Sequence, residues 1–449
     1  MKDLTQGNEA KVIFKFALPM VVGNVFQQLV QVINTAIVGN FIGADAMAAV
    51  GASLYIIFAL IALVMGIGIG GTVVISQYFG AKQVENVKKA SDTMLIFLTL
   101  AGLVIGIFAI IFCRPILRLT NLHEQLYDDA QIYLSINMAG MFAMFGYNAI
   151  SSVLRGIGDS VRPLYFLVIS TTLNLGLDLL FVLVFGWGIK GVAWATFIAY
   201  FVSFALVVVY LNKTHELLKF SFKTMAFDKQ IFKHILKIGL PSGFQQTFVA
   251  LGSVALIRIV NSMGVEIMTA YTAAGRIDAF ISMPAMNFSA ALSAFVGQNL
   301  AIRNYKRINR GFMYTLLISG VICLISMLCI YLWGENIMKI FVRSTEPGYN
   351  LIIETGHQYL LIVCSFYIVF STMFVINGLL RGAGATLVPM FVTLLSLWLI
   401  RLPIAHMLSK YTDLGAEGIW WAIPMGWTMG LIGALTYFLS GKWKGKSIV

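Results

Sequence analysis

The chain has 449 residues, of which 59% are hydrophobic and only 11% are charged. About a quarter of the residues in a soluble globular protein are charged, so this composition excludes a water-soluble enzyme or binding domain. The net charge of +12 would suggest nucleic acid as a partner in a soluble protein. Lys and Arg also mark the cytoplasmic loops of membrane proteins, and that explanation fits this apolar chain better. We therefore expect no nucleic acid as a partner. The composition predicts an all-α membrane protein surrounded by lipid.

Apolar stretches long enough to span a bilayer recur along the whole chain. Because many others follow the first of them, it is not a cleaved signal peptide. We expect twelve transmembrane helices, at residues 13–40, 46–79, 92–113, 130–154, 163–185, 190–211, 239–262, 267–300, 312–333, 356–380, 387–409 and 416–440.

Loop charge predicts the orientation of these helices. If the N-terminus lies inside, 22 of the 31 Lys and Arg residues fall in inner segments and only six in outer ones. Positive residues favour the cytoplasmic side. We therefore expect a multi-pass protein of a bacterial-type inner (plasma) membrane, with both termini in the cytoplasm.

The sequence repeats itself once, with six predicted helices in each half. The stretch LRGIGDSVRP at 154–163 returns as LRGAGATLVP at 380–389, and GIKGVAWA at 188–195 returns as GAEGIWWA at 415–422. Six is an even number, so both halves enter the membrane in the same orientation, and a pseudo-twofold axis along the membrane normal should relate the two bundles. We expect an N-terminal lobe at 1–222 and a C-terminal lobe at 223–449, joined by a basic linker. Paired bundles of this kind are typical of transporters that move small organic molecules by alternating access.

Motifs for enzyme chemistry are missing from the sequence. There is no HExxH, no nucleophile paired with a base and no phosphate-binding loop, and the four cysteines match no metal-site spacing. The glycine-rich stretch GIGIGG at 66–71 lies inside an apolar helix, where glycines allow two helices to approach closely. We expect neither an enzyme nor a bound cofactor.

The strongest candidate site lies around Asp178, in the fifth predicted helix. Asn174 precedes it by four residues and shares its helix face. Asn34 in the first helix and Thr196 in the sixth lie at a similar depth, about 10 Å below the outer surface at 1.5 Å per residue. One carboxylate with neutral oxygens suits Na⁺, while Asp178 alone would suit a proton. The alternative is that Asp178 only packs helices and bonds to Asn174 or Thr196.

Other candidates are weaker. In the eighth predicted helix, Asp278, Met283 and Met286 are candidates for a substrate cavity, as is Arg401 in the eleventh; a flexible thioether surface suits varied apolar ligands. Lipid-facing or core packing explains the methionines equally well, and Arg401 has the alternative role of satisfying carbonyls freed by a following proline. Pro19 breaks the pattern of the first helix and is a candidate hinge.

These residues resemble the MATE (multidrug and toxic compound extrusion) family over nearly the whole chain. The resemblance rests on ALPMVVGNVFQQLVQVINTAIVGNFIGADAMAAVG at 17–51, on GLPSGFQQ at 239–246, on FVGQN at 295–299 and on the two LRG turns. It implies a monomeric antiporter that expels hydrophobic, often cationic drugs or metabolites in exchange for Na⁺ or H⁺. The main alternative is a flippase of a lipid-linked or amphipathic substrate, which would need several cations in its cavity.

The resemblance is closer to the DinF-like branch, with a cation site in the N-terminal lobe, than to the NorM branch. Asn174, Asp178 and Thr196 match that branch, in which the first helix carries an Asp where this chain has Asn34. The seventh and tenth helices lack the acids of the NorM branch. With Asn34 neutral, Asp178 loses the like-charge repulsion that favours a proton, so we favour Na⁺ slightly and leave H⁺ open.

Overall fold

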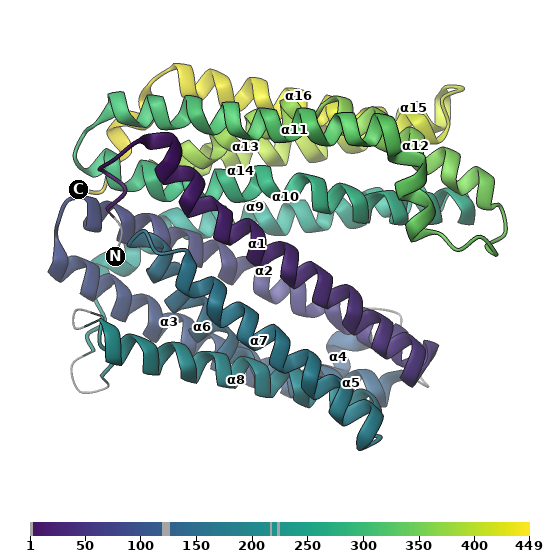
Figure 1. Cartoon of the computed structure of the whole chain (residues 1–449), viewed down its shortest axis with the longest axis horizontal. Helices are drawn as coiled ribbons and strands as arrows, with labels where there is room; N and C mark the ends of the chain where they lie inside the picture. The colour runs from purple at the N-terminus through teal and green to yellow at the C-terminus, as the bar shows by residue number, and fades with distance from the viewer. Residues whose placement is uncertain (1–2, 119–125, 216–217, 222–224) are drawn as a thin grey trace. The chain divides into compact units, whose positions relative to one another are not determined.

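The computed structural model describes the backbone of residues 3–118, 126–215, 218–221 and 225–449, which is almost entirely helical (Figure 1). The first half contains α1 (Glu9–Ile37), the π-turn η1 (Val38–Ile42), α2 (Ala44–Gly80), α3 (Val84–Ile111), α4 (Cys113–Arg118), α5 (Tyr127–Ala139), α6 (Met141–Gly156), α7 (Val161–Leu179), the π-turn η3 (Leu180–Val184) and α8 (Gly188–Thr214).

The second half repeats this order after the linker. It contains α9 (Lys229–Asn261), α10 (Val265–Ala301), α11 (Tyr305–Phe341), α12 (Tyr349–Ser365), α13 (Tyr367–Gly382), α14 (Leu387–Leu394), the π-helical η4 (Leu395–Arg401), α15 (Leu402–Tyr411), α16 (Ala416–Leu439) and the short 3₁₀ helix η5 (Lys442–Lys446).

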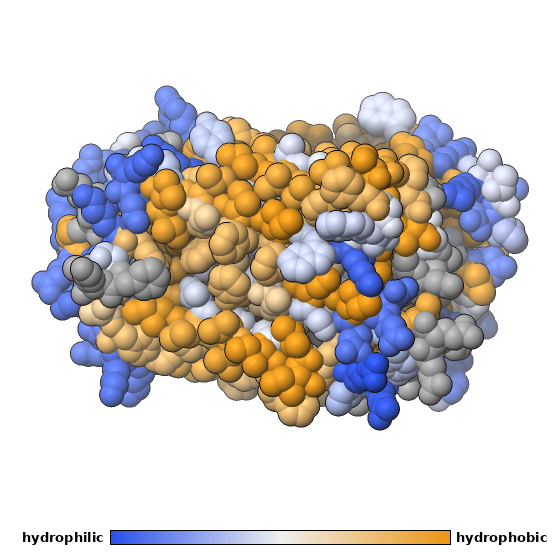
Figure 2. Space-filling model, turned by 90° about the horizontal axis from the view of Figure 1, so that it is seen from below, coloured by the Kyte–Doolittle hydropathy of each residue, from blue (hydrophilic) through white to orange (hydrophobic). Residues whose placement is uncertain are grey.

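The helices have the length and hydropathy that membrane spans require. Within the described residues, nine are long and apolar enough to cross a bilayer, and α12 with α13 makes a tenth span bent by 51°. The two remaining predicted spans correspond to α2 and to the pair α5–α6, which is interrupted at Gly140. The prediction of a twelve-helix membrane protein is confirmed. Figure 2 shows the matching surface, with hydrophobic side chains over the middle of the visible face and hydrophilic ones at both ends.

The chain forms two compact units. The N-terminal unit contains residues 18–243 and the C-terminal unit contains residues 4–17 together with 244–448. The start of α1 thus belongs to the C-terminal unit, and the start of α9 belongs to the N-terminal unit. The predicted lobe boundary at 222/223 lies outside the described residues and stays a prediction.

Each of these shared helices changes unit within about two residues of a proline. The change in α1 falls between Ala17 and Leu18, next to Pro19, and the change in α9 falls between Gly243 and Phe244, close to Pro241. Both helices continue through their prolines. A proline removes one backbone hydrogen bond from a helix, which weakens the helix at that point. The role of Pro19 as a hinge stays a prediction, although α1 does not end there.

Glycines bring α2 against the start of α9 inside the N-terminal unit. A Cβ on Gly66 would collide with the backbone of Gly243, and a Cβ on Gly70 would meet the backbone of Gly239 at 2.7 Å. The two backbones therefore approach as closely as small residues allow. The prediction that GIGIGG at 66–71 serves close helix packing is confirmed.

Substitution of Gly66 by Ala should destabilise this contact. The added methyl group has no room against the Gly243 backbone, so we expect the free energy of unfolding to fall by about 1–3 kcal/mol. The measurement is thermal unfolding of the purified protein in detergent. Gly320→Ala on α11 is the matched control, because a Cβ there meets no atom within 4 Å and alanine favours helices. Equal melting temperatures for the two variants would show that the contact is loose.

Candidate functional site

Three of the four predicted site residues form a hydrogen-bonded chain across α1, α7 and α8 in the N-terminal unit. The Asn34 side-chain amide donates to Oδ1 of Asn174 at 2.8 Å. Nδ2 of Asn174 lies 3.4 Å from Oγ1 of Thr196, and the Thr196 hydroxyl donates to the Val192 carbonyl. The similar depths of these residues in three helices thus bring them into direct contact.

Asp178 lies one helical turn beyond Asn174 on α7, and its side chain is 1% exposed. The π-turn η3 begins two residues later. Among the described residues, neither carboxylate oxygen of Asp178 has a hydrogen-bond partner, and neither does Oδ1 of Asn34. Three acceptor oxygens in one small region are therefore buried without a donor.

Such an arrangement is costly unless something neutralises it. A buried carboxylate with no donor loses its hydration and gains nothing in return, and an ionisable group at membrane depth carries the same cost. Hydrogen bonds of Asp178 to Asn174 or Thr196 would have supported a packing role, but the described contacts include neither. The donor set of one carboxylate with amide and hydroxyl oxygens fits a hard cation such as Na⁺, and the carboxylate by itself fits a proton.

Sequence reasoning missed two tyrosines, one of which interacts with this carboxylate. Tyr133 on α5 is buried and interacts electrostatically with Asp178 and with Tyr200 on α8. Tyr200 follows Thr196 by four residues, so helical spacing already places both on one face. Tyr133 had no comparable signal, because its approach to Asp178 depends on how α5 packs against the other helices.

The C-terminal unit contains a second acid at membrane depth, Asp278 on α10. The Tyr367 hydroxyl of α13 donates to its Oδ1, and Tyr359 and Arg401 also interact with the carboxylate. Arg401 ends η4, and its Nε is buried with no partner among the described residues. This acid has donors and a nearby cation, so it is better satisfied than Asp178.

The two candidate methionines lie on α10, one and two turns beyond Asp278. Met286 is exposed and Met283 is half-buried. Their exposure fits both lipid contact and a cavity wall, so their predicted role stays a prediction. Of the predicted residues, those in the N-terminal unit come together, while those in the C-terminal unit divide into the Asp278–Arg401 pair and the methionines.

Comparisons with known proteins agree along almost the whole chain. The MatE family model matches residues 19–180 and 241–407. The probable multidrug resistance protein YpnP of Bacillus subtilis is 32% identical over 446 residues, which is 99% of this chain and 98% of that protein. YoeA of the same organism, also a probable multidrug resistance protein, is 31% identical over 96% of this chain and 94% of its own length.

Solved structures share the fold. A multidrug resistance MATE family transporter in an outward-facing conformation superposes with a TM-score of 0.91 at 24% identity, covering 98% of this chain and 97% of the other. A MATE structure in complex with MaD3S gives a TM-score of 0.90 at the same identity and coverage. These structures have the twelve-helix, two-lobe fold.

The unpartnered carboxylate makes a prediction about stability. Asp178→Asn removes a buried charge, so the variant should unfold at a higher temperature than the wild type at alkaline pH without Na⁺. Added Na⁺, or acidification, should stabilise the wild type, because a ligand that binds only the folded state raises its stability. The variant should lose that response.

The measurement is thermal unfolding across Na⁺ and pH series, with choline replacing Na⁺. Asp128→Asn is the matched control, because Asp128 is an exposed acid paired with Arg114 at the surface. A response to Na⁺ and pH that is identical in Asp178→Asn and the wild type would contradict the site.

Proposed function

The chain belongs to the MatE family, and from that premise we propose that it is an antiporter that exports hydrophobic, often cationic organic compounds in exchange for Na⁺ or H⁺. The observation that carries the coupling is the buried Asp178 carboxylate, which has no hydrogen-bond partner among the described residues. The relatives named above, probable multidrug resistance proteins, support the substrate class.

The residues around Asp178 have separate tasks in this proposal. Asp178 supplies the negative charge that a cation or a proton neutralises. Asn174 receives the amide of Asn34, and that bond orients the Asn34 side chain so that its Oδ1 remains free as an acceptor. Thr196 holds Asn174 from the other side. Because Asn34 belongs to α1 and its partners to α7 and α8, a change of charge at Asp178 alters how α1 packs in this unit.

The C-terminal unit supplies the second part of the proposal. Asp278 on α10 offers a negative charge, and Met283 and Met286 offer adaptable apolar surface next to it along the same helix. We propose these residues, with Arg401, as contacts of the transported compound. Arg401 and the three aromatic residues Tyr271, Tyr359 and Trp420 form a dense polar-aromatic region around the acid.

The flippase alternative is not favoured by the distribution of charge. A lipid-linked pyrophosphate needs several cations for its phosphate groups. Among the described residues, Arg258 is exposed on the outer part of α9. Arg401 is then the cation that remains near Asp278 in the C-terminal unit. We propose the DinF-like branch because Asp178, a carboxylate with no hydrogen-bond partner among the described residues, lies in the N-terminal unit. We also propose a monomer of the inner membrane with cytoplasmic termini.

Transport in proteoliposomes tests the proposal directly. With a cationic dye as substrate, the wild type should transport under a Na⁺ gradient or under a pH gradient, each imposed separately. Asp178→Asn should abolish gradient-driven transport while the protein remains folded and inserted, because no charge remains to be neutralised. Asp128→Asn is the control. Wild-type rates in Asp178→Asn under the same gradient would refute the coupling role, and flipping of a lipid-linked sugar would favour the alternative.

The identity of the coupling ion depends on Asn34. A second carboxylate at this position would repel Asp178 and favour a shared proton at neutral pH. We therefore expect Na⁺ to drive the wild type and Asn34→Asp to shift the dependence towards H⁺. Asn34→Gln, which keeps the amide, is the control. A wild type that responds to a pH gradient and ignores Na⁺ would show that burial alone makes Asp178 a proton site.

A further inference from the structure

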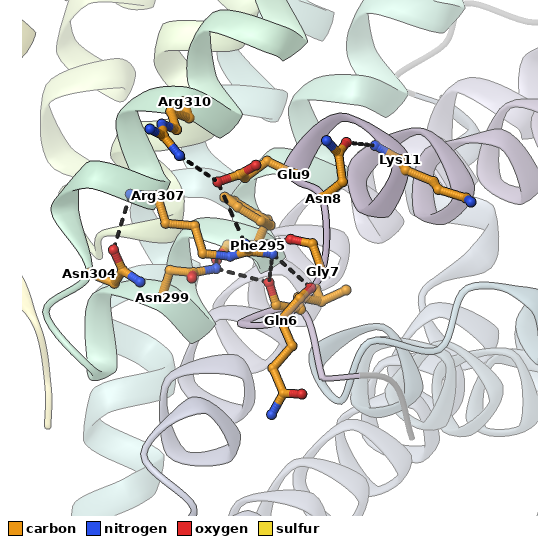
Figure 3. Close-up of polar contacts among 11 residues, drawn as sticks. Gln6, Gly7, Asn8, Glu9, Lys11, Phe295, Asn299, Asn304, Arg307 and Arg310 are labelled. Atoms are coloured by element: carbon orange, nitrogen blue, oxygen red, sulfur yellow. Dashed lines mark hydrogen bonds and ion pairs between the residues drawn. The ribbon is translucent and has the colours of Figure 1, made fainter.

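An arginine on α11 makes several of the hydrogen bonds that attach the segment before α1 to the C-terminal unit. We call residues 4–17 the N-terminal strap; they belong to the C-terminal unit although most of α1 belongs to the other. Arg307, on the first turn of α11, points at the strap from the side (Figure 3). Its guanidinium donates to the carbonyls of Gly7 at 2.6 Å, Gln6 at 2.8 Å and Leu4 at 3.3 Å.

Further polar and aromatic contacts surround the Arg307 guanidinium and the strap. Glu9 lies 3.6 Å from the Arg307 guanidinium, and both side chains are nearly buried. The ring of Phe295 lies under the guanidinium, with 5.4 Å from Cζ to the ring centre. The Leu4 N–H donates to Gln298 at 2.9 Å, and the Asn299 amide donates to the Leu4 carbonyl at 3.2 Å.

Apolar side chains of the strap, including those at the start of α1, add packing contacts to these polar ones. Leu4, Ile13 and Phe16 are each at most 4% exposed. Ile13 reaches α11 at Gly311, where a Cβ on the glycine would collide with the Phe295 ring and lie 3.1 Å from Cδ1 of Ile13. The strap is therefore part of the C-terminal unit's core, and separating it would expose both a buried ion pair and apolar surface.

From this attachment we propose that Arg307 is a positioning residue for transport. It fixes the start of α1 on the C-terminal unit, and α1 carries Asn34 about 37 Å further along, at 1.5 Å per residue. The proposal rests on the proposed function in taking Asn34 as part of the cation cluster. A rearrangement at Asn34 and a displacement of the strap's unit then act on the two ends of one helix, and Pro19, the predicted hinge, lies between these ends next to the change of unit.

The second half contains a matching attachment, because the start of α9 is held on the N-terminal unit. Such attachments are therefore part of the internal repeat. Residues 229–243 of α9 belong to the N-terminal unit. The Asp228 N–H donates to the Thr93 hydroxyl at 3.0 Å, and the Lys88 ammonium donates to the Lys219 carbonyl at 2.9 Å. Each half therefore begins its first helix on the unit formed mainly by the other half. Ahead of that helix, Arg307 holds three backbone carbonyls in the first half, and Lys88 holds one in the second.

Arg307→Gln tests the proposal, because it keeps a hydrogen-bonding side chain but cannot hold three carbonyls and Glu9. We expect the rate of gradient-driven dye transport to fall about five- to tenfold, a typical loss of coupling between sites. Na⁺- or proton-induced stabilisation of the purified protein should stay within about twofold in apparent affinity, because Asp178 is untouched. Arg310→Gln on the same helix is the control, since Arg310 reaches only Glu9, at 4.0 Å, and is mostly exposed.

A cross-link separates positioning from folding. Glu9→Cys and Arg310→Cys, in a protein whose four native cysteines are replaced, can be joined by a short bis-maleimide. The cross-linked protein should transport normally and should restore transport to Arg307→Gln in the same sample. A cross-link that blocks transport would show that the strap has to detach, and unaltered transport by Arg307→Gln without the cross-link would also overturn the proposal. If Asp178→Asn transports normally while the cross-link still rescues Arg307→Gln, the cation assignment fails and the strap retains its role.

Discussion

A carboxylate without a partner, placed where lipid surrounds the protein, is the constraint on which the N-terminal unit depends. Asp178 is 1% exposed and has no hydrogen-bond donor among the described residues. In water this charge would be solvated, but inside a helix bundle it must be neutralised from outside the chain. The amide groups of Asn34 and Asn174 and the Thr196 hydroxyl near it make hydrogen bonds. The unsatisfied acceptors are thus confined to the Asp178 carboxylate and the neighbouring Asn34 Oδ1.

The two units use their buried charges differently. In the N-terminal unit, the acid on α7 is followed by the π-turn η3; in the matching span of the C-terminal unit, η4 ends in the cation Arg401. A π-turn widens a helix locally and often marks a functional position. The acid of the C-terminal unit, Asp278, comes from another helix and receives a tyrosine hydroxyl. The duplicated architecture therefore carries unlike chemistry in its two halves.

The fold could be predicted from the sequence because its signals can be read without knowing any tertiary contact. Helix periodicity and the length of apolar stretches are local, and the internal repeat appears when the two halves are compared. The sequence also predicted that Asn34, Asn174 and Thr196 meet, since depth in a membrane follows from counting residues along a helix. It did not reveal Tyr133, whose neighbours come from another helix, or the strap, whose contacts with Arg307 span about three hundred residues. A polar segment ahead of a helix looks like a free terminus until its binding partner is seen.

The distance in sequence between the strap and its binding residues also has a consequence for biosynthesis. Gln298, to which the Leu4 N–H donates, is synthesised 294 residues after Leu4. At elongation rates of about 5–20 residues per second, that interval lasts roughly 15–60 s. Throughout it, the apolar side chains of residues 4–17 have no binding site. The attachment of the N-terminal strap to α10 and α11 is therefore among the late steps of maturation, and α1 completes its packing only after the first turn of α11 has been synthesised.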